Sequence, residues 1–193
     1  MKKSIYWSLP MEYELTKKIN FAEDKKEGRK ITAIQAVLAL VAIGIGFLIC
    51  PFEKALSVPQ EEMIAALILS LVVVMIWVIF HEKAHGAVIR SITGKKAEYK
   101  RVEGVRISYA ASKALFSKSA YLQVVLMPML VLTGLVVIAT VVAGPQWFWY
   151  VYIVEICNLI IAAEDLYGAF TALKMPEKTL VFHRGSQTQF YSK

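Results

Sequence analysis

The stretch LVVVMIWVIF at residues 71–80 runs directly into HEKAH at residues 81–85, and this junction decides the fold. Two histidines four residues apart share one face of a helix, so the imidazoles of His81 and His85 can bind one zinc ion. Glu82 points about 100° further round the helix, where its carboxylate can take a proton from a zinc-activated water molecule. The motif therefore predicts hydrolytic chemistry, and the apolar run before it predicts a location in a membrane.

The composition also favours an integral membrane protein. Hydrophobic residues make up 57% of the 193 residues, more than a soluble globular chain of this length usually carries. The formal net charge of +7 does not indicate a nucleic-acid partner, because Lys and Arg cluster at the ends of apolar segments. Cys50 and Cys157 lie within or beside these segments, and we expect small buried side chains rather than a disulfide.

Four apolar segments are long enough to cross a hydrocarbon core of about 30 Å, which takes roughly 20 helical residues. They cover about residues 31–50, 63–90, 120–143 and 147–173. We therefore expect an all-α membrane protein with four transmembrane helices, forming a single domain over residues 1–193. The lipid bilayer is its first expected partner.

The distribution of Lys and Arg predicts the orientation of these spans. Eight lie in residues 1–30 and eight in 90–118, against one in 51–62 and none in 144–146. By the positive-inside rule, both termini and the middle loop face the cytoplasm. His81 follows the outer end of its span by about 18 residues, or about 27 Å at 1.5 Å per residue, which places it near the cytoplasmic interface.

Two short β-hairpins are expected on this cytoplasmic side. Residues 97–111 contain two β-prone runs around Glu103 and Gly104, and the tail at 174–193 contains two more around Arg184 and Gly185. We expect His183, in the tail, to be a surface residue.

The third zinc ligand should come from the fourth span, which carries several polar residues in an apolar segment. Asp165 follows the outer end of this span by about 18 residues, the same depth as His81, so it is our candidate ligand. Glu164 is turned about 100° away and is the weaker choice. Glu155 and Asn158 share a face with Asp165 and are candidate supporting residues, although they could simply hydrogen-bond neighbouring helices.

Taken together, these residues resemble the bacterial zincin peptidase membrane family, formerly catalogued as a domain of unknown function and similar in plan to the site-2 proteases. The resemblance covers most of the chain. It rests on the motif from His81 to Gly86, a hairpin ending in Ser108–Ala111, Pro128 in the third span, the string from Asn158 to Asp165, and a tail led by Pro176.

The resemblance implies a zinc peptidase of the bacterial cell membrane. In site-2 proteases two motif histidines and a later aspartate hold the zinc, and these roles transfer to His81, His85 and Asp165. The chain departs from their aspartate motif, because no proline separates Asn158 from Asp165 and Leu166 follows in place of glycine. This departure leaves the role of Asn158 open.

The expected function is hydrolysis of peptide bonds near the cytoplasmic interface, with one zinc ion and Glu82 as the general base. The substrate is a peptide or a membrane protein. The strand that contains Val105, Ile107 and Tyr109 could pair with an extended substrate by β-addition. The sequence leaves the substrate's identity and the oligomeric state open.

Two other classes of protein remain open. A non-catalytic zinc-binding membrane protein, or pseudoprotease, could use the same fold as a binding module, although retention of the base Glu82 argues against it. An ordinary four-helix membrane adaptor could carry the motif by chance, and such a protein would be purified without zinc.

Overall fold

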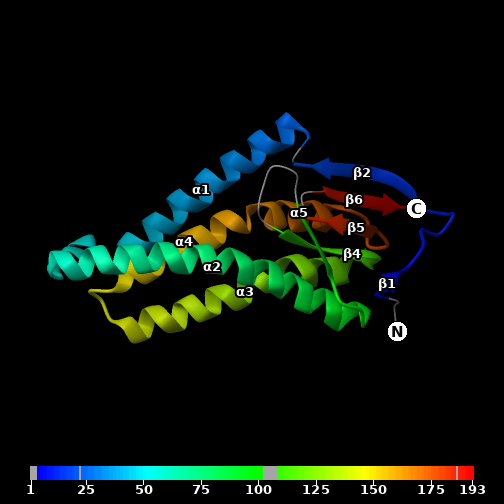
Figure 1. Ribbon diagram of the computed structural model, residues 1–193. Coiled ribbons are helices and arrows are strands. Elements are labelled where there is room, and N and C mark those ends of the chain that lie inside the picture. Colours follow the sequence, from blue (N-terminus) through cyan, green and yellow to red (C-terminus); the bar gives the residue numbers. More distant parts are fainter. Residues whose placement is uncertain (1–3, 22, 102–107, 186) are drawn as a thin grey trace. The chain divides into compact units, whose positions relative to one another are not determined.

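The computed structural model describes residues 4–21, 23–101, 108–185 and 187–193. Its helices are α1 (Lys25–Ile49), η1 (Phe52–Ser57), α2 (Gln60–Thr93), α3 (Lys118–Ala143), α4 (Phe148–Ile161) and α5 (Ala163–Lys174). Its strands are β1 (Ile5–Tyr6), β2 (Glu14–Asn20), β3 (Glu98–Arg101), β4 (Ser108–Ser117), β5 (Leu180–Arg184) and β6 (Gln187–Ser192). The chain is mostly helical with a small antiparallel sheet (Figure 1).

Contacts between residues divide the chain into two compact units. The unit with the strands, called the sheet unit below, comprises residues 1–31, 82–128 and 164–193, and the helical unit comprises residues 32–81 and 129–163. One division falls inside α2, directly after His81. The expectation of a single domain stays a prediction.

Three helices, α1, α2 and α3, are long and apolar enough to cross a membrane. Large apolar side chains such as Leu48, Met75 and Val142 are exposed along them, which would be unfavourable in water and is what a helix in lipid requires. These helices indicate a membrane protein, and they confirm the first three predicted segments as candidate spans.

The fourth predicted span is not one helix. The chain from residue 148 to 174 forms two helices, α4 and α5, which are separated at Ala162. Neither Gly nor Pro stands near this break, and Ala162 and Ala163 are fully buried, so packing rather than local sequence ends α4. The prediction of a continuous helix over 147–173 is therefore wrong. α4 has 14 residues and does not reach the length of a span by itself.

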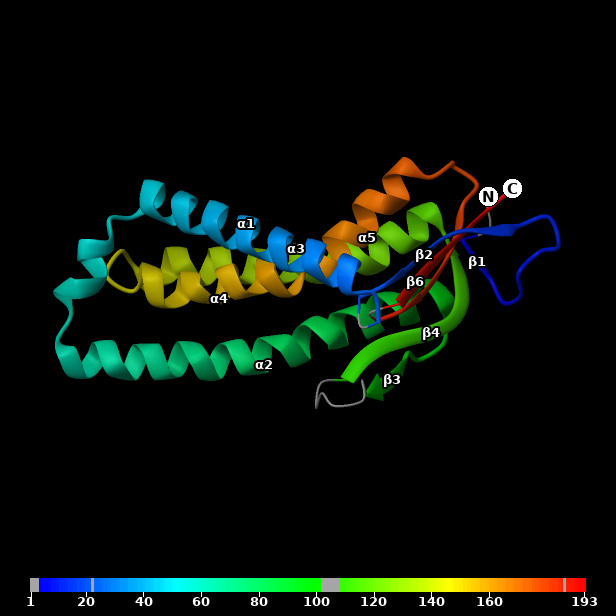
Figure 2. The same ribbon diagram turned by 90° about the horizontal axis from the view of Figure 1, so that it is seen from above.

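The strands form one antiparallel sheet with the order β1-β4-β5-β6-β2, and β3 also pairs with β4. Both predicted hairpins are confirmed, because Tyr99 of β3 lies opposite Ala110 of β4 and Val181 of β5 lies opposite Phe190 of β6. The predicted turn at Glu103 and Gly104 lies outside the described residues. Because the two hairpins belong to one sheet, which also takes in β1 and β2 from the N-terminal segment, the all-α description needs correction (Figure 2).

The hydrophobic core of the sheet unit lies between this sheet and parts of α2, α3 and α5. Alternating residues of the strands point into it, as half-buried strands require. Its fully buried larger side chains are Ile19, Ile89, Phe116, Tyr121, Val124, Val125, Val181 and Phe190. This core fixes the end of α2 that carries the HEKAH motif against α3 and the sheet.

Candidate metal centre

Helix α2 carries the three residues of the motif that could do chemistry. His81 and His85 are 1% and 6% exposed, and they lie one turn apart on the same helix. Although the division between the two units falls after His81, α2 is continuous there, so helical geometry alone relates the two imidazoles. Both rings face protein rather than solvent or lipid.

Helix α5 brings the predicted third ligand to this pair. Oδ2 of Asp165 lies 3.1 Å from Nε2 of His85. One ligand atom from each of His81, His85 and Asp165 can be chosen so that all three lie within 4.8 Å of one another. The structure thus brings together the three residues that the sequence predicted as ligands.

The contacts of His85 test whether this group fits a metal ion. Nδ1 of His85 lies 2.9 Å from the carbonyl oxygen of Val124, so in a neutral imidazole Nδ1 carries the proton and donates it. Nε2 then offers a lone pair to the same space as the Asp165 carboxylate. A cation satisfies both electron-rich atoms, and two imidazole nitrogens with one carboxylate oxygen are a ligand set that zinc accepts in catalytic sites.

Glu82 lies beside strand β4. Its Oε2 accepts a hydrogen bond of 2.8 Å from the backbone N–H of Ala110. This bond holds the carboxylate between the motif helix and the first half of β4. The Glu82 carboxylate therefore lies next to the backbone of β4.

Gly86, which follows the motif, makes room for strand β3. The hydroxyl oxygen of Tyr99 lies 2.1 Å from the position that a Cβ atom at Gly86 would occupy. Only a residue without a side chain allows this approach. The glycine therefore lets a β3 side chain pack directly against the turn of α2 that carries His85.

The other acidic and amide candidates of the fourth segment do not belong to the metal group. Glu164 is half-buried on α5, next to Asp165. In the helical unit, Oε1 of Glu155 accepts a hydrogen bond of 2.7 Å from Thr133, and Nδ2 of Asn158 donates to Thr133 at 3.1 Å and to Glu155 at 3.4 Å. Glu155 and Asn158 thus hydrogen-bond each other and α3. Hydrogen bonding to a neighbouring helix was the alternative that the sequence left open.

His183 is buried, so the prediction of a surface residue is wrong. It points inward from β5 because of the alternation of the strand, and its Nδ1 lies 2.9 Å from Oγ1 of Thr188. Burial lowers the pKa of His183 to about 4, although the charge of Asp165 acts in the opposite direction. Among the described residues, the metal group contains no fourth ligand from His183. Three protein ligands are what a catalytic zinc site has.

The proposed substrate-pairing strand is described only in part. Val105 and Ile107 lie outside the described residues. Tyr109 lies in β4, and its ring packs against Gly185, where a Cβ atom would lie 2.4 Å from Cδ2 of the ring. Gly185 has φ +55°, which favours glycine, so this turn of the tail hairpin requires Gly for two reasons.

A family model described as "Putative zincin peptidase" matches residues 73–180, more than half of the chain. The chain belongs to this family. The matched residues include the whole HEKAH motif and Asp165. Neither a search of curated proteins nor a search of solved structures returned a significant match. The description of this family suggests peptidase activity, and the name zincin implies zinc as the metal.

Some groups around the metal centre of this zincin peptidase family member could not be foreseen from its sequence. Val124 and Ala110 contribute a backbone carbonyl and a backbone N–H, and no residue type signals such roles. Tyr121 is fully buried near Asp165, but in the sequence it is only an aromatic residue at the start of an apolar segment. A sequence signal does exist for Gly86, because glycine directly follows the second histidine.

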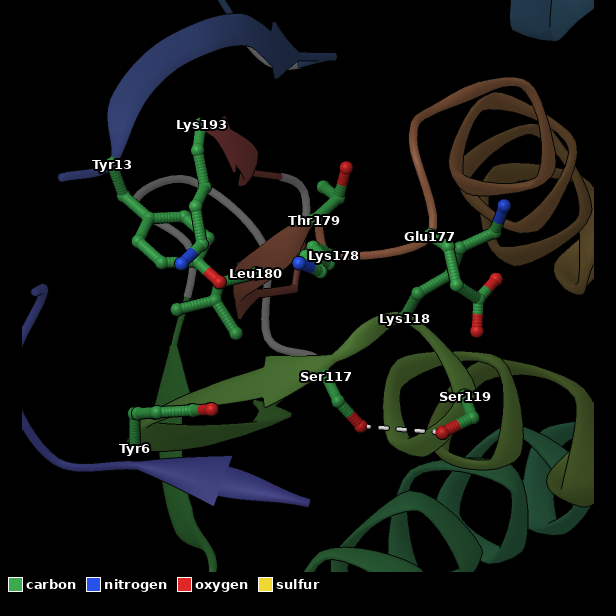
Figure 3. Close-up of a pocket in the computed structure, with 10 residues that line it drawn as sticks. All are labelled: Tyr6, Tyr13, Ser117, Lys118, Ser119, Glu177, Lys178, Thr179, Leu180 and Lys193. Atoms are coloured by element: carbon green, nitrogen blue, oxygen red, sulfur yellow. Dashed lines mark hydrogen bonds between the residues drawn. The ribbon is translucent and has the colours of Figure 1, made fainter. Parts of the chain in front are cut away.

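A polar hollow of about 330 Å³ lies at the start of α3 (Figure 3). Lys118 lines it, and its Nζ donates to the carbonyl oxygens of Leu173 and Met175 at 3.0 and 2.9 Å. Lys193, also in the hollow, forms an ion pair with Glu12. These two amino groups bind protein groups, and Lys118 holds the C-terminal end of the helix that carries Asp165.

Proposed function

We propose that this protein is a membrane-embedded zinc metallopeptidase that hydrolyses peptide bonds near the cytoplasmic interface. The single observation that carries the proposal is the grouping of His81, His85 and Asp165 within 4.8 Å, with Glu82 next to the first histidine. Membership of the zincin peptidase family supports the reaction class.

In this mechanism His81, His85 and Asp165 would hold one zinc ion. When bound, zinc would act as a Lewis acid, which polarises the scissile carbonyl and lowers the pKa of water. Glu82 would take the proton of the attacking water and deliver it to the leaving amine. The carbonyl of Val124 orients the ring of His85 through Nδ1, which leaves Nε2 available as the ligand atom.

The substrate in this proposal is an extended segment of a peptide or membrane protein. A helix protects its peptide bonds by internal hydrogen bonds, so the segment must unwind before attack. The hydrogen bond from Ala110 to Glu82 brings the proposed base beside the backbone of β4. The described part of β4 already pairs with β1, β3 and β5, so addition of a substrate strand there would require one of these pairings to open. Tyr109 is the described residue of the predicted pairing strand.

The proposed membrane arrangement keeps four crossings with both termini in the cytoplasm of a bacterial cell. The fourth proposed crossing keeps the bounds predicted from the sequence, about residues 147–173. The excess of Lys and Arg in residues 1–30 and 90–118 supports a cytoplasmic location for these segments and for the adjoining active site.

The decisive experiment separates metal binding from hydrolysis. Glu82→Gln should keep zinc but abolish cleavage, since it removes the base and leaves the ligands. His81→Ala and Asp165→Ala should lose zinc, measured by elemental analysis of the purified protein. Glu164→Ala is the matched control for Asp165→Ala, because it removes a neighbouring carboxylate outside the metal group.

Cleavage is followed by comparing protein termini in cells that carry the wild type or Glu82→Gln. Termini that disappear in the variant identify substrates. Undiminished zinc in His81→Ala would refute the assigned site, and zinc loss in Glu164→Ala but not Asp165→Ala would mean that the wrong carboxylate was chosen. Zinc in the wild type without any terminus that depends on Glu82 would favour the pseudoprotease.

A further inference from the structure

A buried chain of polar side chains lies beside Asp165 in the sheet unit. The side chain of Tyr121, on α3, lies next to Thr188 on β6. Oγ1 of Thr188 lies 2.9 Å from Nδ1 of His183 on β5. The exposed fractions of Tyr121, Thr188 and His183 are 1%, 2% and 8%. Helix α3 thus meets both strands of the tail hairpin at the side chain of Thr188.

This group of buried polar side chains touches α5, the helix that carries the proposed ligand Asp165. The hydroxyl oxygen of Tyr121 lies 2.3 Å from the position that a Cβ atom at Gly168 would occupy, so it rests on the backbone of α5. Gly168 is three residues after Asp165, on the same face of α5. The carboxylate of Asp165 also interacts electrostatically with both Tyr121 and His183.

The ring of His183 lies at the other end of this group of polar side chains. It meets the Tyr121 ring edge to face, with 5.6 Å between the ring centroids. The Tyr121 ring meets Phe190 of β6 in the same manner at 6.0 Å. The tail hairpin therefore holds Tyr121 by two ring contacts and by its contact with Thr188, and Tyr121 in turn packs against α5.

We propose that Tyr121, Thr188 and His183 are positioning residues that hold α5 in place and so set the metal affinity of the centre that contains Asp165. This inference rests on the proposed function, since it takes Asp165 as a zinc ligand. Residues that support a metal ligand without binding the metal affect metal affinity, because a small shift of one ligand weakens the whole site. Loss of such a residue typically lowers metal affinity by 10- to 100-fold. The tail hairpin is thus a component of the metal centre.

The test replaces the hydroxyl of Thr188, which lies at the centre of this group of polar side chains. Thr188→Val keeps the shape of the side chain and removes the hydrogen bond to His183 and the polar contact with Tyr121, whereas Thr188→Ser keeps the hydroxyl. Thr179→Val is the matched control, because Thr179 is a buried threonine of the same tail whose Oγ1 lies 2.9 Å from Oγ of Ser192. Zinc affinity is measured by competition with a chelator, and the absorption spectrum of the cobalt-substituted protein reports ligand geometry.

Thr188→Val should weaken zinc binding by about 10- to 100-fold and alter the cobalt spectrum. Thr188→Ser and Thr179→Val should match the wild type in both measurements. Equal affinity and equal spectra for Thr188→Val and Thr179→Val would overturn the inference. If Thr188→Val does not fold, Tyr121→Phe decides the matter, since it keeps the ring and removes only the hydroxyl.

The same titration separates this inference from the proposed function. A wild-type protein that binds no zinc, or a His85→Ala variant that binds it normally, refutes the proposed metal site and the inference with it. Normal zinc binding by the wild type, loss in His85→Ala and full affinity in Thr188→Val refute the positioning role alone.

Discussion

The ring of His85 is oriented at Nδ1 by a backbone carbonyl, and its Nε2 lies 3.1 Å from the carboxylate of Asp165. The motif fixes which residue stands here, but the carbonyl of Val124 fixes how the ring is turned. The same division of roles applies to Glu82, whose carboxylate is oriented by the N–H of Ala110. At the scale of single residues, the chemistry is readable from side chains and the orientation comes from the backbone.

Gly168 offers a prediction at this scale. The Tyr121 hydroxyl occupies the space that a side chain at Gly168 would need, and Tyr121 is too deeply buried to move aside. Gly168→Ala should therefore lower the free energy of unfolding by about 1–3 kcal/mol through overpacking. Thermal denaturation in detergent measures the effect.

Two other glycines serve as controls for Gly168. At Gly134 on α3 nothing lies within 4 Å of an added Cβ atom, so Gly134→Ala should be neutral or slightly stabilising. At Gly86 the obstacle is the hydroxyl of Tyr99, whose side chain is 51% exposed and can swing away, so Gly86→Ala should cost less than Gly168→Ala. A loss at Gly134 equal to that at Gly168 would contradict the explanation.

Helix α5 is anchored at both ends by other elements, near Asp165 by the sheet unit's core and at its end by Lys118. The Lys118 amino group donates to the carbonyl oxygen of Leu173 in the last turn and to that of Met175 just after it, where a positive charge also offsets the helix dipole. The helix that carries the proposed ligand Asp165 is thus anchored although it is only 12 residues long.

Replacing this amino group should loosen α5. Lys118→Met should lower the free energy of unfolding by about 1–3 kcal/mol, since two charge-assisted hydrogen bonds are lost. Lys178→Met is the control, because Lys178 lines the same hollow but is exposed (Figure 3). Chemical denaturation in detergent micelles compares the two, and equal stability of both variants would exclude the anchoring role.

At the level of elements, the sequence predicted what depends on local patterns. Apolar runs predicted α1, α2 and α3, and β-prone runs around glycine predicted both hairpins. The break at Ala162 and the strand β2 escaped prediction, because neither has a local signal: β2 is mostly polar and becomes a strand by pairing with β6. His183 was misjudged for the same reason, since only the assembled sheet buries it.

Over the whole molecule, the sequence predicted which residues would meet but not how they are supported. Counting helical rise brought Asp165 to the depth of His81, and the two do lie together although the counted helix is broken. The groups that orient these residues are brought to them by tertiary packing, which the periodicity of the sequence does not predict.

The proposed orientation in the membrane can be tested with single cysteines. In a chain with Cys50 and Cys157 replaced by Ser, Glu53→Cys should react with a membrane-impermeant maleimide added to intact cells. Lys96→Cys should react only after the cells are permeabilised. Both positions are exposed, so burial does not hide them. The reverse pattern would place the active site on the opposite side of the membrane.

Pairing between β2 and β6 joins residues 14–20 to residues 187–192. A ribosome makes β2 before helices α1, α2 and α3 and its partner β6 after them. The pairing of β2 with β6 therefore cannot form until these helices have been made. The proposed hydrolytic centre would thus lack part of its neighbouring sheet during the period when its own nascent chain is unfolded and most vulnerable to cleavage.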